Sequence, residues 1–246
     1  MGNSGYEKSA VYYDYFDSKD NIDFFSFYAL EAGEALDIGA GTGRISIPLL
    51  RKGIEVYCVE PSKAMINAFR EKIAKEPELN RNLQLVNSDA TSFKINRKFK
   101  YAFMSGVFDH LLTENERKLV LRNIHRHLIK DGKFVFDIFI GLMKSSSLKP
   151  AGEIKHGNIT IRRLVGSEIK KNNIIEVNLV YETYEKNKLK SCIKEKSLVG
   201  IASKEEIYQL LEDCNFKVLN CFSNYDYSMW DEQETNNLLI IEAIKS

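Results

Sequence analysis

The sequence predicts an α/β fold, in which a doubly wound parallel sheet carries a small antiparallel sheet as an insertion. Over the first ~140 residues, short apolar runs of strand type alternate with runs of helix type. From about residue 153 to residue 200 the pattern changes to alternating runs rich in Ile, Val, Thr and Tyr, and it then changes back. A βαβα order places crossover helices on both faces of a parallel sheet.

Length and composition fit one such domain with an insertion. The chain has 246 residues, of which 44% are hydrophobic and 28% charged, and its net charge is +1. Because the chain carries almost no net positive charge, nucleic acid is disfavoured as the main partner. Four scattered cysteines form no CxxC pair, which indicates a reducing compartment and no metal site. No apolar run has the length of a membrane span, so we expect a cytoplasmic protein without membrane contact.

Five strands and three helices are predicted in the first part of the chain. The expected strands are 35–38, 54–59, 83–86, 101–104 and 133–140, the last entered through a turn at Asp131-Gly132. Helices are expected at about 44–52, 62–73 and 113–128. Ser62 suits an N-cap, and Thr113 with Glu116 forms the T-x-x-E pattern of a capping box, so local chemistry supports these helices.

The inserted segment is predicted to form an antiparallel sheet. Its strand-like runs are 158–164, 174–185 and 189–198, with hairpin turns at Lys171-Asn172-Asn173 and 185–188. Its apolar face could form a lid over a site or a dimer surface. The expected domains are a helical cap over 1–32, an α/β domain over 33–145 and 201–246, and the inserted β lid or subdomain over 146–200.

The chain after the insertion returns to helix and strand. Ser203 and Glu206 form a second capping box, which opens a helix through residue 211. Asn215 suits the left-handed residue that ends a helix. The closing strands are expected at 216–222 and 238–244.

A glycine-rich loop with Gly39, Gly41 and Gly43 lies between the first predicted strand and a helix. Glycines there permit a sharp turn and close approach of a ligand to the main chain, and the helix N-terminus adds N–H groups. The spacing is G-x-G-x-G followed by Arg44, not the G-x-G-x-x-G of dinucleotide-binding folds. The loop therefore predicts a nucleotide-like ligand and disfavours a dinucleotide.

Three acidic residues are expected at the same edge of the sheet as the loop. Asp37 precedes the first glycine, where a carboxylate suits an ammonium group better than a diphosphate. Glu60 ends the second strand and can accept hydrogen bonds from a ribose diol, and Asp89 after the third strand could receive an adenine amino group. The predicted ligand thus has an ammonium group, a sugar diol and a purine.

At these residues the sequence resembles the class I (Rossmann-like) S-adenosylmethionine-dependent methyltransferases. ALDIGAGTGR at 35–44 matches their first motif, VEPSKAM at 59–65 the second, and NSDA at 87–90 the third. HLIKDGK at 127–133 is similar to the H-L-x-P-G-G stretch before their fifth strand, with Lys-Asp in place of Pro-Gly. The order and spacing of the motifs agree with the family.

The resemblance implies a seven-stranded sheet in the order 3-2-1-4-5-7-6, with strand 7 antiparallel, and S-adenosylmethionine as the cofactor. It implies that Met65 packs on the adenine. It also implies that Gly39, Gly41, Glu60, Asp89 and Ala90 line the cofactor. The full set of residues that we expect in the cofactor site is Tyr13, Asp37, Gly39, Ala40, Gly41, Glu60, Pro61, Met65, Asp89, Ala90 and Ser105.

A looser likeness extends to a small-molecule subgroup that includes N,N-dimethyltransferases of nucleotide-linked amino sugars. It rests on Tyr12-Tyr13-Asp14, Asp23-Phe24-Phe25, the inserted sheet and Asp213-Cys214-Asn215-Phe216. In that subgroup an N-terminal Tyr and a His after the fourth strand approach the reacting centre, and Tyr13 and His110 match them. The resemblance therefore implies that His110 is a general base and Tyr13 orients the acceptor. A loop histidine bonded to the backbone is the alternative for His110.

The implied reaction is methyl transfer to N or O of a small-molecule acceptor by in-line displacement. The DNA-adenine branch of the family has [D/N]-P-P-[Y/F] where this chain has SGVF at 105–108, and no Cys follows a Pro as in the cytosine-C5 branch. We expect a monomer or a homodimer. Two alternatives stay open: a non-catalytic module that binds S-adenosylmethionine or S-adenosylhomocysteine, and an NAD-dependent oxidoreductase.

Several further residues have structural expectations. We expect His125 and His127 to be structural or solvated, because their neighbours on the predicted helix are basic. Tyr225, Tyr227 and Trp230 are expected either to line an acceptor pocket or to pack on the inserted sheet. The basic run, which we expect to be a solvated loop, comprises Lys94, Arg97, Lys98 and Lys100.

Overall fold

The main sheet of the protein has seven strands. A computed structural model describes residues 7–16, 19–140, 144–171, 173–231 and 237–246. The strands are β1 (Glu34–Ile38), β2 (Glu55–Glu60), β3 (Leu83–Asn87), β4 (Phe99–Met104), β5 (Leu128–Phe139), β10 (Phe216–Phe222) and β11 (Leu238–Lys245). Their order is β10-β11-β5-β4-β1-β2-β3, and β11 is antiparallel to both neighbours. The predicted order 3-2-1-4-5-7-6, with strand 7 antiparallel, is confirmed.

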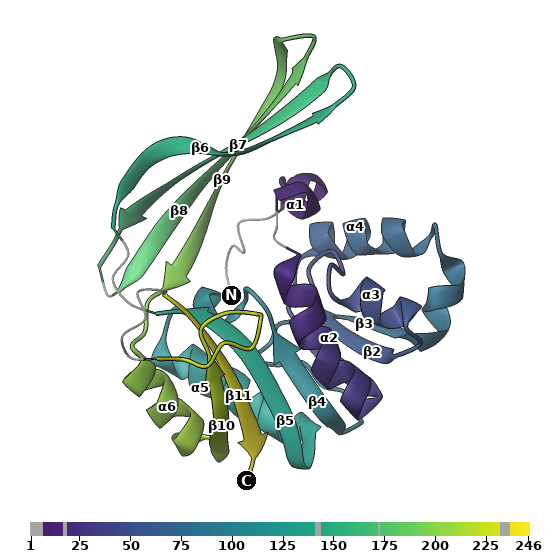
Figure 1. Cartoon of the computed structure of the whole chain (residues 1–246), viewed down its shortest axis with the longest axis vertical. Helices are drawn as coiled ribbons and strands as arrows, with labels where there is room; N and C mark the ends of the chain where they lie inside the picture. Colours follow the sequence, from purple (N-terminus) through teal and green to yellow (C-terminus); the bar gives the residue numbers. More distant parts are fainter. Residues whose placement is uncertain (1–6, 17–18, 141–143, 172, 232–236) are drawn as a thin grey trace.

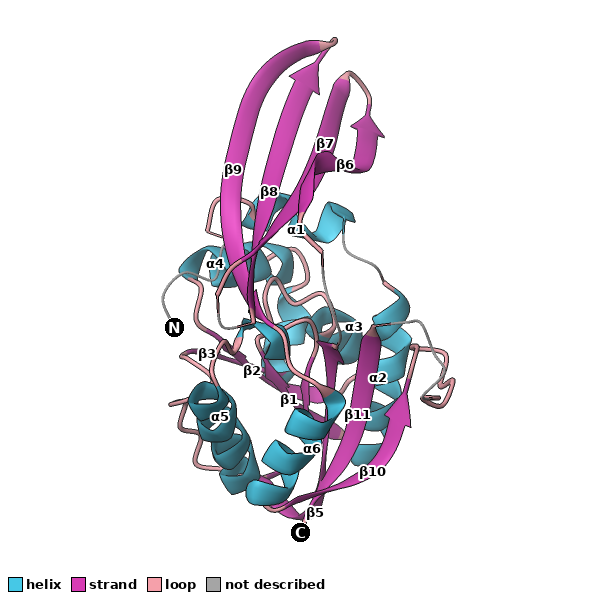
Figure 2. Cartoon of the chain, turned by 90° about the vertical axis from the view of Figure 1, so that its left-hand side faces the viewer, coloured by secondary structure: helices cyan, strands magenta, loops and turns pink. Residues whose placement is uncertain are grey.

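Helices cover both faces of this sheet (Figures 1 and 2). One face packs on a cluster that includes Phe25 and Phe69, and the other on a cluster that includes Ile124 and Leu211. Among the described helices, none is both long and apolar enough to cross a membrane. The helices are α1 (Ala10–Phe16), α2 (Asp20–Ala32), α3 (Ser46–Arg51), α4 (Lys63–Ile73), α5 (Glu114–His127) and α6 (Lys204–Asp213), with 3-10 turns η1 (Pro77–Asn82) and η2 (Phe108–His110).

The predicted helix caps are confirmed. Ser62 Oγ accepts a hydrogen bond from Met65 N at the start of α4. At the start of α5, Thr113 Oγ1 accepts from Glu116 N, and the Glu116 carboxylate accepts from Thr113 N, which is a complete capping box. The same reciprocal pair opens α6. Asn215 has a φ of 60°, as expected for the left-handed residue after that helix.

The start of the fifth strand differs from the prediction. We expected it at residue 133 after a turn, whereas β5 begins at Leu128, immediately after α5. The pairing with β4 jumps from Phe99–Leu128 to Tyr101–Lys133, and Asp131 between them has a φ of 61°. The Asp-Gly pair therefore forms a bulge within the strand. Such a bulge has the same local composition as a turn before a strand, so the sequence did not distinguish the two.

The inserted segment forms a four-stranded antiparallel sheet, which confirms the predicted insertion. Figures 1 and 2 show that it projects from the α/β body, with α1 between it and α4 in Figure 1. Its first strand was not predicted, because nearly all of its residues are exposed and show no alternation. Pro150 is tolerated there because this strand lies at the edge. The strands are β6 (Ser146–His156), β7 (Ile159–Ile169), β8 (Ile174–Glu185) and β9 (Lys188–Gly200), in that order.

The two predicted hairpin turns connect consecutive strands of this sheet. Between β8 and β9, Lys186 and Asn187 have φ of 47° and 63°, as a two-residue hairpin turn requires. Between β7 and β8, Asn173 has a φ of 56°, and the predicted turn residue Asn172 lies outside the described residues.

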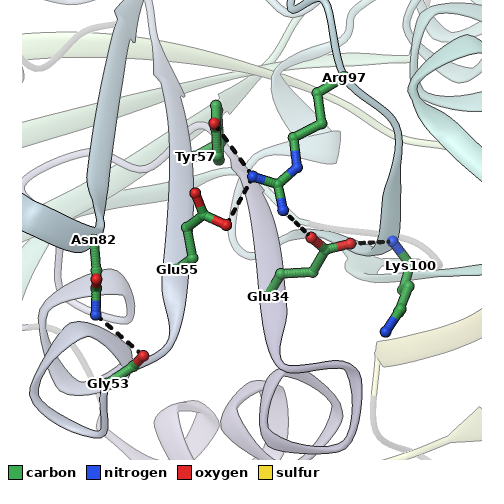
Figure 3. A network of polar contacts seen from close by, with 7 residues as sticks. All are labelled: Glu34, Gly53, Glu55, Tyr57, Asn82, Arg97 and Lys100. Atoms are coloured by element: carbon green, nitrogen blue, oxygen red, sulfur yellow. Dashed lines mark hydrogen bonds and ion pairs between the residues drawn. The ribbon is translucent and has the colours of Figure 1, made fainter.

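Arg97 was expected in a solvated loop, and this expectation is wrong. Its guanidinium donates to Glu34 at the start of β1 and, at 2.7 Å, to Glu55 at the start of β2 (Figure 3). It also lies over the ring of Tyr57, 5.1 Å from the centroid. Glu34 in turn accepts from Lys100 N of β4 at 2.9 Å. Arg97 therefore holds together the amino ends of neighbouring strands, a long-range contact that composition does not reveal.

We predict that Arg97→Ala lowers the free energy of unfolding by about 1–2 kcal/mol, because charge-assisted hydrogen bonds are lost at a partly exposed site. Urea denaturation of the two proteins measures the difference. Lys94→Ala changes an exposed residue of the same basic run, and it should change the stability by less than about 0.5 kcal/mol. Equal effects of the two substitutions would contradict the structural role of Arg97.

Candidate active site

The glycine loop lies at the carboxyl edge of the main sheet, between β1 and α3. Gly39 and Gly41 have φ of 82° and 56°, in the region that favours glycine. Gly39 N and Ala40 N both donate to Val59 O of β2, at 2.8 and 3.2 Å. The loop is thus tied to the second strand and turns back over the sheet edge.

Glu60 fixes this loop from the end of β2. Its carboxylate accepts hydrogen bonds from Gly41 N at 2.9 Å and from Ser62 N at 2.8 Å, and the side chain is buried. Burial raises the pKa of Glu60, while the two backbone hydrogen bonds act in the opposite direction. The predicted residue therefore lies next to the glycine loop, as its place at the strand end requires.

Asp37 is a buried carboxyl group under the same loop. It accepts a hydrogen bond from Ser46 Oγ at 2.5 Å, and burial, with a contribution from Glu60, raises its pKa to about 7. A small cavity of about 30 Å³ opens beside Asp37, lined also by Tyr13, Gly39, Ala40, Gly41, Arg44, Ile45 and Ser105. Buried carboxylates are stabilised by a nearby cation, so a ligand with an ammonium group fits this position.

The other predicted cofactor residues follow along the sheet edge and line neither described cavity. Pro61 continues from Glu60, and its carbonyl accepts from Asn87 Nδ2 at 3.0 Å. Met65 is buried in α4. Asp89 accepts hydrogen bonds from Thr91 N and Thr91 Oγ1, at 2.7 and 2.6 Å, and the next residue, Ala90, is buried.

A larger cavity of about 440 Å³ adjoins the small one. Tyr13, Arg44 and Ser105 line both. Its walls come from the ends of β4 and β5 on one side and from the inserted sheet on the other. The residues contributed by β8 and β9 are mostly apolar and include Val177, Leu179, Tyr181 and Val199. The inserted sheet therefore forms part of the wall of a cavity next to the glycine loop.

Helix α1 connects the glycine loop to the inserted sheet. Asp14 accepts a hydrogen bond from Thr42 Oγ1 at 2.6 Å and forms an ion pair with Lys72 of α4. On the other side of the helix, Tyr12 stacks on Tyr181 of β8, with 5.5 Å between the ring centroids. These contacts hold the intervening Tyr13 where the two cavities meet.

His110 lies in η2, after β4, and lines the larger cavity. Its Nδ1 is 3.0 Å from Leu198 O of β9. Burial lowers the pKa of His110 below its usual 6.5, against the effect of that hydrogen bond, so the imidazole is neutral at pH 7. The structure thus brings His110, Tyr13 and Ser105 to one cavity.

Asp137 of β5 is a site residue that the sequence reasoning missed. It is buried at the cavity wall and accepts hydrogen bonds from Ser105 Oγ at 2.9 Å, Gly106 N at 2.5 Å and Tyr225 Oη at 2.8 Å. A carboxylate within the otherwise apolar run 134–140 was the available signal.

Asp109, Asn21 and Arg163 also line the larger cavity and were not predicted. Asn21 Nδ2 donates to Ser105 Oγ at 2.8 Å. Asp109 precedes His110, and Phe139 N donates to its Oδ1 at 3.2 Å. These residues come from α2, η2 and β7, and no short motif connects them.

The remaining aromatic and histidine residues that were singled out from the sequence differ in their surroundings. Tyr225 lines the larger cavity, whereas Tyr227 packs on Phe24 of α2, with 4.7 Å between ring centroids. His127 is structural, as expected, because its Nε2 accepts from Ile95 N at 3.1 Å while Nδ1 lies 2.8 Å from Asn123 O.

Comparisons with known proteins address the family. The sequence model described as "Methyltransferase domain" matches residues 36–134. Uncharacterized methyltransferases of Bacillus mycoides (strain KBAB4) and Bacillus thuringiensis (strain Al Hakam) are each 32% identical over 104 residues. The match covers 42% of this chain and 46% of each relative, so the chain spans about half the length of the curated relatives that it matches.

Solved methyltransferase structures match nearly the whole chain. An S-adenosylmethionine-dependent methyltransferase from Clostridium acetobutylicum ATCC 824 has a TM-score of 0.78 at 16% identity, covering 98% of this chain and 96% of its own. The CcbJ methyltransferase from Streptomyces caelestis has a TM-score of 0.82 at 17% identity, and the match covers 98% of this chain and 97% of that protein. The sugar N-methyltransferase KedS8 from Streptoalloteichus sp. ATCC 53650 has a TM-score of 0.78 at 16% identity, and the match covers 100% of this chain and 95% of that protein.

The resemblance to the class I methyltransferases is confirmed. At these identities the structural likenesses show a methyltransferase fold, and they extend over the inserted sheet as well as the α/β body.

The glycine loop provides a stability test. We predict that Gly39→Ala destabilises the protein more than Gly41→Ala. Both positions have positive φ, which costs an alanine about 1–2 kcal/mol. A Cβ at Gly39 would also lie 2.4 Å from Val107 Cγ2, whereas at Gly41 no heavy atom lies within 4 Å. Thermal unfolding of the two variants measures the difference, and equal losses would contradict the described path of the loop.

Proposed function

We propose that this chain is an S-adenosylmethionine-dependent methyltransferase that transfers a methyl group to N or O of a small-molecule acceptor. One observation carries the proposal: a glycine loop with two buried carboxyl groups, Asp37 and Glu60, adjoins a separate cavity of about 440 Å³. A methyltransferase needs such an arrangement, because donor and acceptor must be held in line and shielded from water.

In the proposed complex the glycine loop and the ends of β1 to β3 hold the donor. Asp37 fits an ammonium group, since its carboxyl is buried with a pKa raised to about 7, which a nearby cation would lower. Glu60 lies where it can accept hydrogen bonds from ribose hydroxyls, and Met65 and Asp89 lie further along the edge, toward an adenine. The bound donor supplies an electrophilic methyl group next to a good leaving group.

The larger cavity is proposed to hold the acceptor, and the inserted sheet is proposed to serve as its lid. The apolar residues of β8 and β9 exclude water, and Tyr13 and His110 contact the acceptor near the donor. Positioning of this kind can contribute ~7–11 kcal/mol to the lowering of the barrier. His110 orients the acceptor or receives its proton.

The relatives support this assignment. S-adenosylmethionine is named for the similar protein from Clostridium acetobutylicum, and sugar N-methylation for KedS8. A non-catalytic S-adenosylmethionine-binding module is the second candidate, but it would not need a second cavity with buried ionisable groups. The glycine spacing and Asp37 disfavour an NAD-dependent oxidoreductase.

We predict that S-adenosylhomocysteine binds the protein and that Glu60→Ala weakens the binding by about 10- to 100-fold, because charge-assisted hydrogen bonds to the ligand are lost. Titration calorimetry measures both affinities. Glu71→Ala, which changes an exposed carboxylate on α4, is the matched control and should bind as the unchanged protein does. Absence of heat with both S-adenosylmethionine and S-adenosylhomocysteine would refute the proposed function.

We further predict that His110→Ala binds S-adenosylhomocysteine normally and turns over about 10²- to 10⁴-fold more slowly, as expected on loss of a group that orients the acceptor or receives its proton. Transfer of labelled methyl groups to a panel of amines, hydroxy compounds and nucleotide sugars provides the assay. His156→Ala, at an exposed position of β6, is the control. Normal turnover by His110→Ala would rule out a role for this residue in the reaction.

A further inference from the structure

Two carboxyl groups line the larger cavity, the buried Asp137 and the half-buried Asp109. Asp109 comes from η2 and Asp137 from β5, and neither forms an ion pair within the described residues. Arg117 lies near Asp109, but its guanidinium donates to Leu111 O and Gly200 O, both at 3.0 Å. Like charges that are buried together must be neutralised by a proton or by a bound cation.

The surroundings of the two carboxyl groups determine which one holds a proton. Burial raises the pKa of Asp137, while its three hydrogen-bond donors and the charge of Arg44 act in the opposite direction. Burial and the charge of Asp137 raise the pKa of Asp109 to about 8, against the effects of the Phe139 N–H and Arg117. The hydrogen bonds to Asp137 and the raised pKa of Asp109 therefore favour Asp109 as the carboxyl group of the pair that holds a proton. The other ionisable groups on the cavity wall are Tyr13, Arg44, His110, Arg163, Tyr181 and Tyr225.

We propose that the Asp109–Asp137 pair binds the reacting nitrogen of an amine acceptor and that Asp109 receives its proton. This inference rests on the methyltransferase function proposed above. It assigns to the substrate a cationic nitrogen that contacts both carboxyl groups. It also adds Asp109 to the residues that contact the reacting atom.

The proposed steps balance in charge and protons. The acceptor enters as an ammonium ion, and its charge displaces the proton of Asp109 into solvent. An N–H proton then passes to an Oδ of Asp109, which leaves a neutral amine beside a carboxylic acid. The nitrogen lone pair forms the C–N bond while the C–S bond of the donor breaks and its electron pair stays on sulfur.

The same surroundings make Asp109 a better proton acceptor than His110. Burial lowers the pKa of His110 below 6.5, whereas that of Asp109 is raised to about 8. An aliphatic amine has a pKa of about 10, and an ordinary carboxyl of about 4 would leave it protonated and unreactive. A carboxyl group with a raised pKa narrows this gap, so proton transfer from the amine costs less than it would with an ordinary carboxyl group. His110 then acts by orienting the acceptor.

The first step can be measured without knowing the acceptor. The probe is tetramethylammonium, titrated by calorimetry into the complex with S-adenosylhomocysteine at pH 7 in two buffers of different ionisation enthalpy. Comparison of the two heats gives the number of protons released. S-adenosylhomocysteine is used because it lacks the charge of the sulfonium. We expect the release of close to one proton, since Asp109 with a pKa of about 8 is mostly protonated beforehand.

Four variants assign the proton to its source. Asp109→Asn should abolish the release, and Asp137→Asn should reduce it, because loss of the neighbouring charge lowers the pKa of Asp109. His110→Gln should release the proton as before. Asp213→Asn, an exposed acid on α6, is the matched control and should not differ from the unchanged protein. Urea denaturation checks that each variant is folded.

The outcomes separate this inference from the proposed function. No binding of tetramethylammonium, no proton release, or a release that persists in Asp109→Asn or disappears in His110→Gln would overturn the role of Asp109. Failure of S-adenosylhomocysteine to bind would instead overturn the proposed function. The titration of tetramethylammonium into the free protein would still test the carboxyl pair in that case.

Discussion

The hydrogen bond from Gly41 N to the Glu60 carboxylate joins the first two strands of the sheet where the backbone turns most sharply. It keeps a glycine loop with positive φ closed over the strand ends, together with the two bonds to Val59 O. Asp37 is buried beneath this loop, and Thr42 of the loop holds α1 through Asp14. Tyr13, on α1, consequently lies between the two cavities. The arrangement of both cavities thus depends on the path of this loop.

The inserted sheet lies opposite the ends of β4 and β5, and the cavity between them has two chemically different walls. The β8 and β9 side is mostly apolar, whereas the β4 and β5 side carries Asp109, His110 and Asp137. An apolar wall removes water, and removal of water strengthens every charge interaction within the cavity. The same desolvation raises the pKa of Asp109 and lowers that of His110. Desolvation of the cavity thus makes Asp109, and not His110, the stronger proton acceptor of the two.

The fold and the surroundings of the glycine loop could be predicted because their signals are local. Glycine spacing, a carboxylate at a strand end and a capping box each lie within a few residues, as Gly39, Glu60 and Thr113 show. Of the larger cavity, Tyr13 and His110 were named from the sequence, whereas Asn21, Asp109 and Asp137 were not, because they meet only after the sheet has formed. The strand β6 and the contacts of Arg97 with the strand ends were also not predicted. An exposed edge strand and a long-range ion pair both leave no periodic pattern in the sequence.

The most direct test of the donor site is a crystal structure of the protein with S-adenosylhomocysteine. The account predicts that the ligand lies across the glycine loop, with its ribose hydroxyls within hydrogen-bond distance of Glu60 and its adenine beside Met65 and Asp89. Its sulfur should face the cavity that contains Tyr13 and His110. A ligand bound away from this loop, or with its sulfur directed away from that cavity, would contradict the account.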